Sequence, residues 1–156
     1  MVNRARAARG EPPLTEDEML GRAIDIKAAK GPIDDEANRR TVGATSAPDR
    51  VRILSDRGID ATVEHPVHMD QYIAEGRGVS VSVHPYWYWP QWGGAQPHWT
   101  HEVLITGVEY DENGKVKAYI INDTGLGQCG LRVSADDFSY AQQPRAGITV
   151  TKAPLP

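Results

Sequence analysis

The sequence predicts one α+β domain over residues 1–156, in which helices come first and an antiparallel sheet follows. Two observations carry this prediction. In residues 1–76, apolar side chains recur every three or four positions, which is typical of helices that bury one face. In residues 77–156, apolar and polar side chains alternate, which is typical of half-buried strands. A chain of 156 residues is long enough for one domain with its own hydrophobic core.

The first predicted helix covers residues 2–9 and has the composition of a helix end. Arg4, Arg6 and Arg9 suit the negative end of a helix dipole, and Gly10 is a typical residue just beyond such an end. No pattern that begins a helix precedes them, and an isolated helix of about two turns is marginal in water. We therefore expect a truncated first helix, of which this chain holds only the last turns.

Two further helices are predicted from their start signals. Thr15 and Glu18 form a capping box ahead of a run of apolar residues at helical spacing. After the polar segment 31–46, Pro48 suits the first turn of a short helix, and Gly58 suits its stop. Residues 59–63 are then expected to form a short edge strand, and residues 68–75 a short helix.

The second half is predicted to form most of the sheet. Valines alternate with polar residues between Val79 and Val83, and residues 111–114 have the composition of a hairpin turn. Ser134 is a suitable cap for a small helix that carries Phe138. The strands expected here cover residues 79–83, 101–110, 115–122, 131–133 and 147–151.

Composition excludes several classes of protein. The chain has 17 Lys and Arg residues against 21 Asp and Glu residues, and this net charge of −4 disfavours nucleic-acid binding. No apolar run approaches the roughly 20 residues that cross a bilayer, so no membrane contact is expected. The N-terminus lacks the apolar core of a secretory signal. We expect a cytoplasmic protein, or a domain delivered as part of a larger secreted one.

The candidate site lies at the open end of the predicted hairpin. His101 is ten residues before Asp111, and Asp123 is nine residues after Gly114. Antiparallel pairing through this turn makes His101 and Asp123 neighbours. A carboxylate beside an imidazole fixes its tautomer and stabilises the imidazolium, as in a catalytic base and its orienting acid. The alternative is structural: a histidine at a strand end, and an aspartate that caps a turn.

The stretch HEVLITGVEYDENGKVKAYIINDTG resembles the module of papain-like cysteine peptidases in which a strand led by His turns into a strand that ends in Asp. Among these, it is most similar to bacteriocin-processing peptidases and to the papain-fold domains of bacterial polymorphic toxins. The order of the surrounding elements extends the resemblance over residues 2–152. The matching residues of the module are His101, Gly107, Tyr110, Asp111, Gly114, Asn122, Asp123 and Gly125.

The resemblance implies a papain-like fold and the chemistry of a cysteine peptidase or a glutamine deamidase. His101 would act as base and Asp123 would orient it, while a thiolate attacks the amide carbon of a peptide or protein substrate. No cofactor is implied. The resemblance also implies that a toxin or effector domain of this kind would bind an immunity or partner protein.

The nucleophile is where the chain departs from that family. The family carries its cysteine on the first long helix, ahead of the counterpart of residues 2–9, and this chain has none there. We therefore expect the chain to be inactive alone. We also expect a homodimer, or marginal stability, because the lost helix turns leave an apolar groove on the sheet.

Cys129 is the single cysteine, and it offers a weaker alternative nucleophile. It does not open a helix, so no helix N-terminus activates it. It also rules out a disulfide framework within the chain. A third reading is a metal site made of His84, His98, His101 and Asp123, but our prediction is that no metal is bound.

All four tryptophans lie between Trp87 and Trp99, just ahead of His101. Such aromatic side chains can clamp an extended peptide, and we predict that Trp99, Trp87 and Asn122 bind substrate. The alternative for the tryptophans is a small core that fixes a long loop to the sheet.

Three interpretations therefore stay open. The first is part of a cysteine enzyme that keeps the His–Asp half of its triad. The second is a non-catalytic domain that binds a peptide or a partner. The third is a hydrolase that uses Cys129 or a metal.

Overall fold

The computed structural model describes residues 1–29, 45–84, 100–142 and 147–156. Trp87 and Trp99, predicted to bind substrate, and His98 lie outside these residues. The elements in chain order are α1 (Val2–Ala8), α2 (Glu16–Asp25), α3 (Ala47–Asp56), β1 (Ala61–Glu64), the 3-10 helix η2 (Pro66–His68), α4 (Met69–Ala74), β2 (Arg77–Val83), β3 (His101–Tyr110), β4 (Val116–Asp123), β5 (Gln128–Ser134), α5 (Ala135–Ala141) and β6 (Ile148–Pro154).

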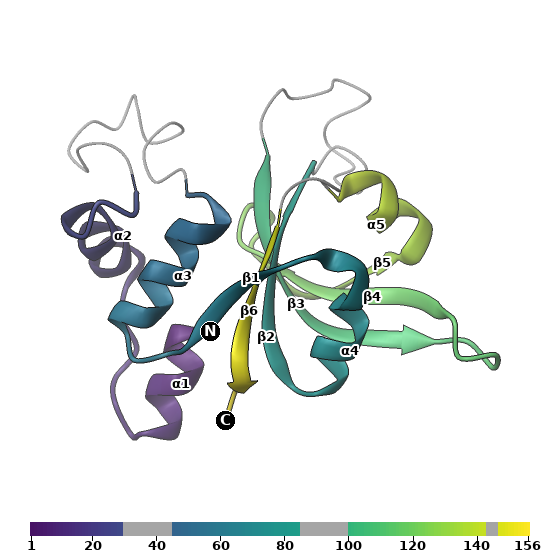
Figure 1. Cartoon of the computed structure of the whole chain (residues 1–156), viewed down its shortest axis with the longest axis horizontal. Coiled ribbons are helices and arrows are strands. Elements are labelled where there is room, and N and C mark those ends of the chain that lie inside the picture. Colours follow the sequence, from purple (N-terminus) through teal and green to yellow (C-terminus); the bar gives the residue numbers. More distant parts are fainter. Residues whose placement is uncertain (30–44, 85–99, 143–146) are drawn as a thin grey trace.

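The six strands form one sheet in the order β1-β6-β2-β3-β4-β5, and each neighbouring pair is antiparallel. Helices α1, α2 and α3 lie on one side of this sheet, and α4 and α5 lie on the other (Figure 1). The predicted α+β class and its antiparallel sheet are confirmed.

The start signals in the sequence act as predicted. Thr15 and Glu18 form the capping box of α2, with the Glu18 backbone N–H donating to the Thr15 hydroxyl. Ser46 and Asp49 form a second capping box at α3, which the sequence analysis did not identify. Ser134 caps α5 by accepting from the backbone N–H three residues ahead. Each cap satisfies backbone groups that a helix end leaves unpaired.

Three strands are longer than predicted. β2 begins at Arg77 rather than at residue 79. β5 begins at Gln128 rather than at residue 131, and β6 continues to Pro154 rather than ending at residue 151. β6 is extended by pairing with a distant partner, because it lies between β1 and β2 and Arg77 pairs with Pro154. β5 begins early because Gln128 pairs with Asp123 across the turn that follows β4. Hydrophobic alternation within a short window does not report such pairing.

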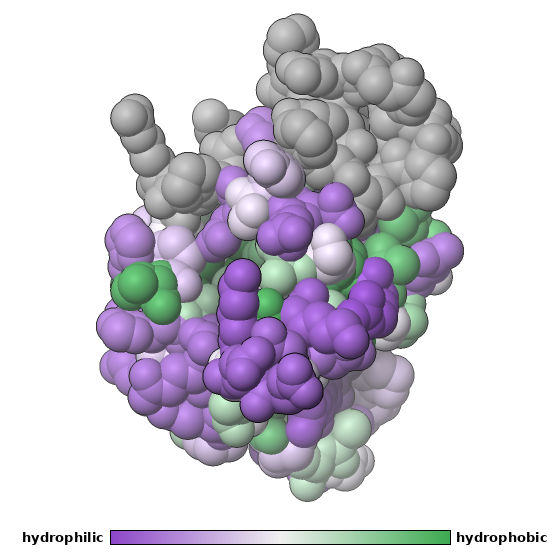
Figure 2. Space-filling view, turned by 90° about the vertical axis from the view of Figure 1, so that its right-hand side faces the viewer, coloured by the Kyte–Doolittle hydropathy of each residue, from purple (hydrophilic) through white to green (hydrophobic). Residues whose placement is uncertain are grey.

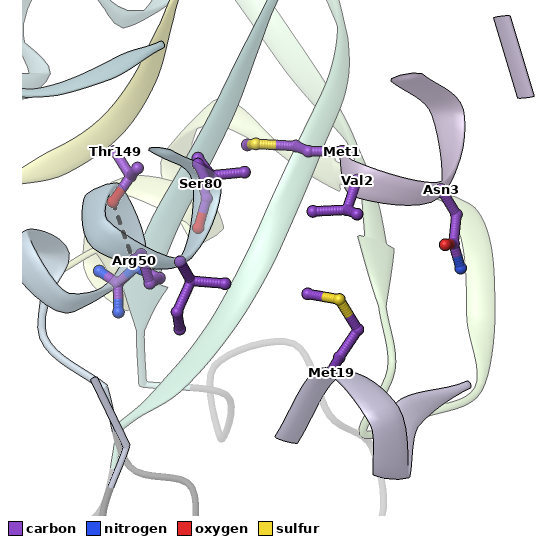
Figure 3. A pocket seen from close by; sticks show the side chains of 9 residues that line it. Met1, Val2, Asn3, Met19, Arg50, Ser80 and Thr149 are labelled. Carbon is purple, nitrogen blue, oxygen red and sulfur yellow. Dashed lines mark hydrogen bonds between the residues drawn. The ribbon is translucent and has the colours of Figure 1, made fainter. Parts of the chain in front are cut away.

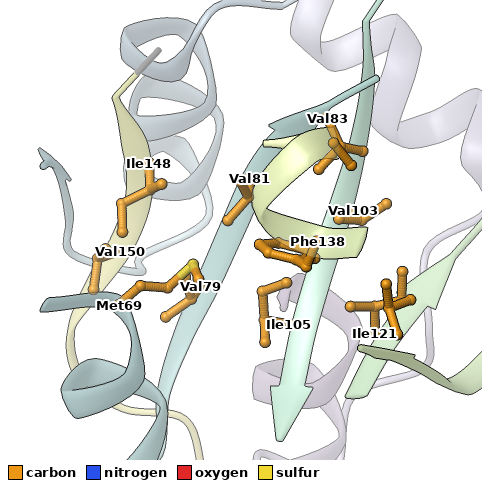
Figure 4. Close-up of a cluster of buried hydrophobic side chains, with 12 residues drawn as sticks. Met69, Val79, Val81, Val83, Val103, Ile105, Ile121, Phe138, Ile148 and Val150 are labelled. Atoms are coloured by element: carbon orange, nitrogen blue, oxygen red, sulfur yellow. The ribbon is translucent and has the colours of Figure 1, made fainter. Parts of the chain in front are cut away.

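The main core lies between the sheet and the two helices α4 and α5 (Figure 4). Phe138 of α5 is 1% exposed, and its ring lies 4.6 Å from the Tyr119 ring. A smaller core joins α1 and α3 to β1 on the other side of the sheet. The buried residues of the main core are Met69, Val79, Val81, Val83, Val103, Ile105, Ile121, Val133, Phe138, Ala141, Ile148 and Val150.

The surface on the side of the β3–β4 hairpin is mainly hydrophilic. Figure 2 shows charged and polar side chains over most of the described part of this face, with hydrophobic side chains in small patches. No helix within the described residues is long and apolar enough to cross a membrane.

Candidate functional site

The candidate site lies at the end of the sheet where β2 ends, β3 begins and β4 ends. Val83, the last residue of β2, pairs with His101, the first of β3. Leu104 of β3 pairs with Asn122, which brings Asp123 at the end of β4 beside the start of β3. The distance from Nε2 of His101 to Oδ1 of Asp123 is 2.7 Å. The predicted juxtaposition of these two residues is therefore confirmed.

Asp123 is held by its own turn as well as by the histidine. Its side chain is 0% exposed, and Oδ1 accepts the backbone N–H of Gly125 at 2.8 Å and that of Leu126 at 3.2 Å. A buried carboxylate needs such donors to replace the water it has lost. The turn after β4 therefore fixes the direction in which the carboxylate faces His101.

The imidazole is partly open to solvent, with the His101 side chain 17% exposed. An ionised Asp123 requires the proton on Nε2, because a carboxylate only accepts hydrogen bonds. In a catalytic base of this kind, the second ring nitrogen, here Nδ1, would be the one to exchange a proton. This arrangement suits an oriented general base.

A charged pair that the sequence analysis missed lies on the opposite face of the same strand end. Glu102 follows His101, and its Oε1 lies 2.9 Å from Nε of Arg50 on α3. Burial raises the pKa of Glu102, and the Arg50 guanidinium opposes that rise without cancelling it. Burial also lowers the pKa of Arg50. The sequence does contain a signal for this pair, because Glu102 is an acidic residue directly ahead of the apolar residues 103–105.

A cavity of about 300 Å³ lies beside Arg50, between α1, α2 and α3 and the sheet (Figure 3). Its polar end is formed by Arg50, Ser80 and Thr149, and Nε of Arg50 donates to the Thr149 hydroxyl. Its other side is apolar, with Met19 and Val2 among the lining residues. The cavity lies on the side of the sheet that α1, α2 and α3 cover, opposite the main core.

Cys129, the predicted alternative nucleophile, is exposed on β5. The next helix, α5, begins at Ala135, so no helix starts at the thiol. Cys129 therefore lacks the helix N-terminus that lowers the pKa of many catalytic thiols and that stabilises an oxyanion.

Asn122, predicted to bind substrate, alternates with Asp123 along β4 and so lies on the other face of the strand. Its Oδ1 accepts the backbone N–H of Gly130 at 2.9 Å. The described residues contain no group of three or more His, Cys, Asp or Glu side chains able to hold a metal, and His98 lies outside them.

Comparison of the chain with protein-family models gives no match, and comparison with curated proteins gives none either. The grounds for a function are therefore the geometry of His101 and Asp123 and the residue pattern around them.

Proposed function

We propose that this chain is a cysteine peptidase-like or glutamine deamidase-like domain of the bacterial toxin or effector type, with a papain-like fold. The observation that supports this most directly is the 2.7 Å contact between His101 and the buried Asp123. In the proposed reaction, Nδ1 of His101 accepts the proton of a thiol. The thiolate attacks an amide carbon, and the imidazolium returns the proton to the leaving amine or ammonia. Water then releases the acyl group.

The pair is suited to amide hydrolysis because the base must gain and lose a proton both when the acyl group forms and when water releases it. A buried carboxylate at hydrogen-bond distance stabilises the imidazolium that forms in between. The carboxylate cannot swing away, since Gly125 and Leu126 also donate to it. His101 is partly exposed, so a substrate amide can reach it.

The proposed reaction needs a thiol that approaches Nδ1 of His101. Cys129 is the only thiol within the sequence, and it is exposed on β5, where none of the described helices begins. Residues 1–156 alone should therefore hold the base without the nucleophile.

The test compares residues 1–156 with the longest in-frame product of the natural gene. Both are assayed for cleavage of a peptide library and for ammonia release from glutamine-containing protein. We expect activity only in a longer product that contains a further cysteine, and loss of that activity in His101→Ala. Hydrolysis that survives His101→Ala, or a gene with no further cysteine, would overturn the proposal. Activity of residues 1–156 that Cys129→Ser abolishes would instead make Cys129 the nucleophile.

A second candidate is a non-catalytic domain that binds an extended peptide or a partner protein. The exposed position of Cys129 on β5 favours it, because the described site holds no thiol. Peptide binding that persists in His101→Ala, measured by fluorescence anisotropy and without turnover in any product of the gene, would support this candidate over the enzyme.

A further inference from the structure

The first three residues of β3 are held differently from the rest of the strand. His101, Glu102 and Val103 pair with β2, whereas pairing of β3 with β4 begins at Leu104. His101 therefore lies beyond the last paired residue on the side where Asp123 sits. Within the described residues, backbone pairing thus joins the start of β3 to β2 and not to β4.

Glu102 supplies a second attachment, through its side chain. Its Oε2 accepts the Ser82 hydroxyl at 2.7 Å, and its Oε1 accepts the Ser80 hydroxyl and faces Nε of Arg50 at 2.9 Å. Ser80 and Ser82 are the polar residues that alternate with the valines of β2. Both carboxylate oxygens are thus fixed, and they lock the register of β3 against β2 at this end.

Arg50 extends the attachment to the rest of the domain. Its Nε also donates to the Thr149 hydroxyl of β6 at 3.2 Å, and its Nη1 donates to the Thr45 carbonyl at 2.9 Å. The side chains of Arg50 and Glu102 are only 12% and 27% exposed. One guanidinium thus joins α3, β6 and β2 to the residue that follows His101.

Burial of this pair has an energetic cost, because desolvation offsets much of the attraction between two charges. The raised pKa of Glu102 reflects the same cost. Apolar side chains could fill this space without that cost. A buried ion pair differs from them in that its hydrogen bonds are directional, so it can fix the orientation of the strand end.

We propose that Glu102, anchored by Arg50 and the two β2 serines, is a positioning residue that holds His101 at hydrogen-bond distance from Asp123. Glu102 lies on the opposite face of β3 and acts through the strand, without contact with a substrate. The inference deepens the proposed function, since it concerns the same His–Asp pair, but its test uses no activity measurement.

The experiment measures how fast the Nε2 proton of His101 exchanges with water, by NMR on the ¹⁵N-labelled chain. The resonance is identified by its absence in His101→Ala. We expect exchange to become roughly tenfold faster in Glu102→Gln, because the amide has one acceptor oxygen where the carboxylate accepts from both Ser80 and Ser82, so local opening of the strand end breaks fewer hydrogen bonds. We expect a smaller increase, about threefold, in Ser82→Ala, which keeps the ion pair.

The matched control is Asp56→Asn, which removes another ion pair of α3, the one that joins Asp56 to Arg22 at 2.5 Å. It should change His101 exchange by less than about twofold, because the Arg22–Asp56 pair joins α2 to α3 and takes no part in the hydrogen bonds that Glu102 accepts from the two serines. In every variant, hydrogen exchange of the buried backbone amides of Ile121 and Val150 is measured as well, because it reports unfolding of the whole domain. Ser82→Ala decides the question if Glu102→Gln does not fold.

Three results would overturn the proposal. One is unchanged His101 exchange in both Glu102→Gln and Ser82→Ala. Another is acceleration equal to that of the Ile121 and Val150 amides, or equal to that in Asp56→Asn, since either would mean a general loss of stability. The last is the absence of a protected Nε2 proton in the unmodified chain. Failure of the amide-hydrolysis assays would leave this inference standing, so the two can be told apart.

Discussion

Nε2 of His101 lies 2.7 Å from Oδ1 of Asp123, although 22 positions separate the two residues in the sequence. The contact is a product of strand register, because β3 and β4 are joined by a tight turn and Leu104 pairs with Asn122. A shift of one residue in that pairing would carry one side chain to the other face of the sheet. The hydrogen bond therefore reports the register of the β3–β4 hairpin as well as the chemistry of the site.

The first prediction concerns Asp123. Oδ1 accepts hydrogen bonds from His101, Gly125 and Leu126, and an asparagine oxygen can accept the same bonds. We expect Asp123→Ala to lower the free energy of unfolding by roughly 2–4 kcal/mol, because it leaves buried donors unpaired. Asp123→Asn should cost clearly less. Urea unfolding of the three proteins measures the difference, and equal losses would contradict the orienting role of the oxygen.

The sequence alone predicted the parts of the fold that depend on local signals. The capping box at Thr15 and Glu18, the turn at residues 111–114 and the β3–β4 pairing are all set by residues close together in the chain. The same locality made the contact of His101 with Asp123 predictable, because one turn connects their strands.

Features that depend on the order of strands in the sheet were not predicted. β6 lies between β1 and β2, and this placement brings Thr149 to Arg50. Glu102 then meets the same guanidinium from β3. Three segments far apart in sequence form this cluster, and no hydrophobic period within one segment reports which strands become neighbours.

The second prediction is a pH dependence that comes from Glu102. Burial raises the folded-state pKa of this carboxyl above its ordinary value of 4.5. The folded protein therefore holds the proton more tightly than the unfolded chain, so the contribution of Glu102 is largest below pH 4.5 and declines as pH rises through the raised pKa. The stability of the unmodified chain relative to Glu102→Gln should thus fall as the pH rises above about 4.5.

Urea unfolding of both proteins across this pH range measures that difference. Asp49→Asn provides a contrast, because hydrogen bonds from Ser46 lower the pKa of Asp49. Its contribution is present above the ordinary pKa and is lost as pH falls, which gives a slope of the opposite sign. A rise in the Glu102 contribution with pH would mean that attraction to Arg50 exceeds the cost of burial.

The third prediction concerns Gly78, at the start of β2. A Cβ there would lie 2.7 Å from Cδ1 of Leu155 and 3.1 Å from both the Met1 sulfur and Cγ2 of Thr151. Gly78→Ala should lower the free energy of unfolding by about 1–3 kcal/mol, because three neighbours must shift together. The control is Gly107→Ala, whose Cβ would meet Ile120 at 3.4 Å. It should cost less, and the reverse order in thermal or urea unfolding would contradict the packing described around Met1 and Leu155.

The fourth prediction concerns the core beneath α5. Phe138 is 1% exposed and its ring lies 4.6 Å from that of Tyr119, so Phe138→Ala should lower the free energy of unfolding by about 3–5 kcal/mol. Tyr140, two residues along the same helix, is 63% exposed, and Tyr140→Ala should cost about 1 kcal/mol or less. α5 also ends beside the site, where the backbone N–H of His84 donates to the Ala141 carbonyl at 2.7 Å. Loss of the Phe138 ring should therefore speed exchange of the His84 amide more than Tyr140→Ala does, and similar exchange in both variants would show that α5 does not support the His101 end of the sheet.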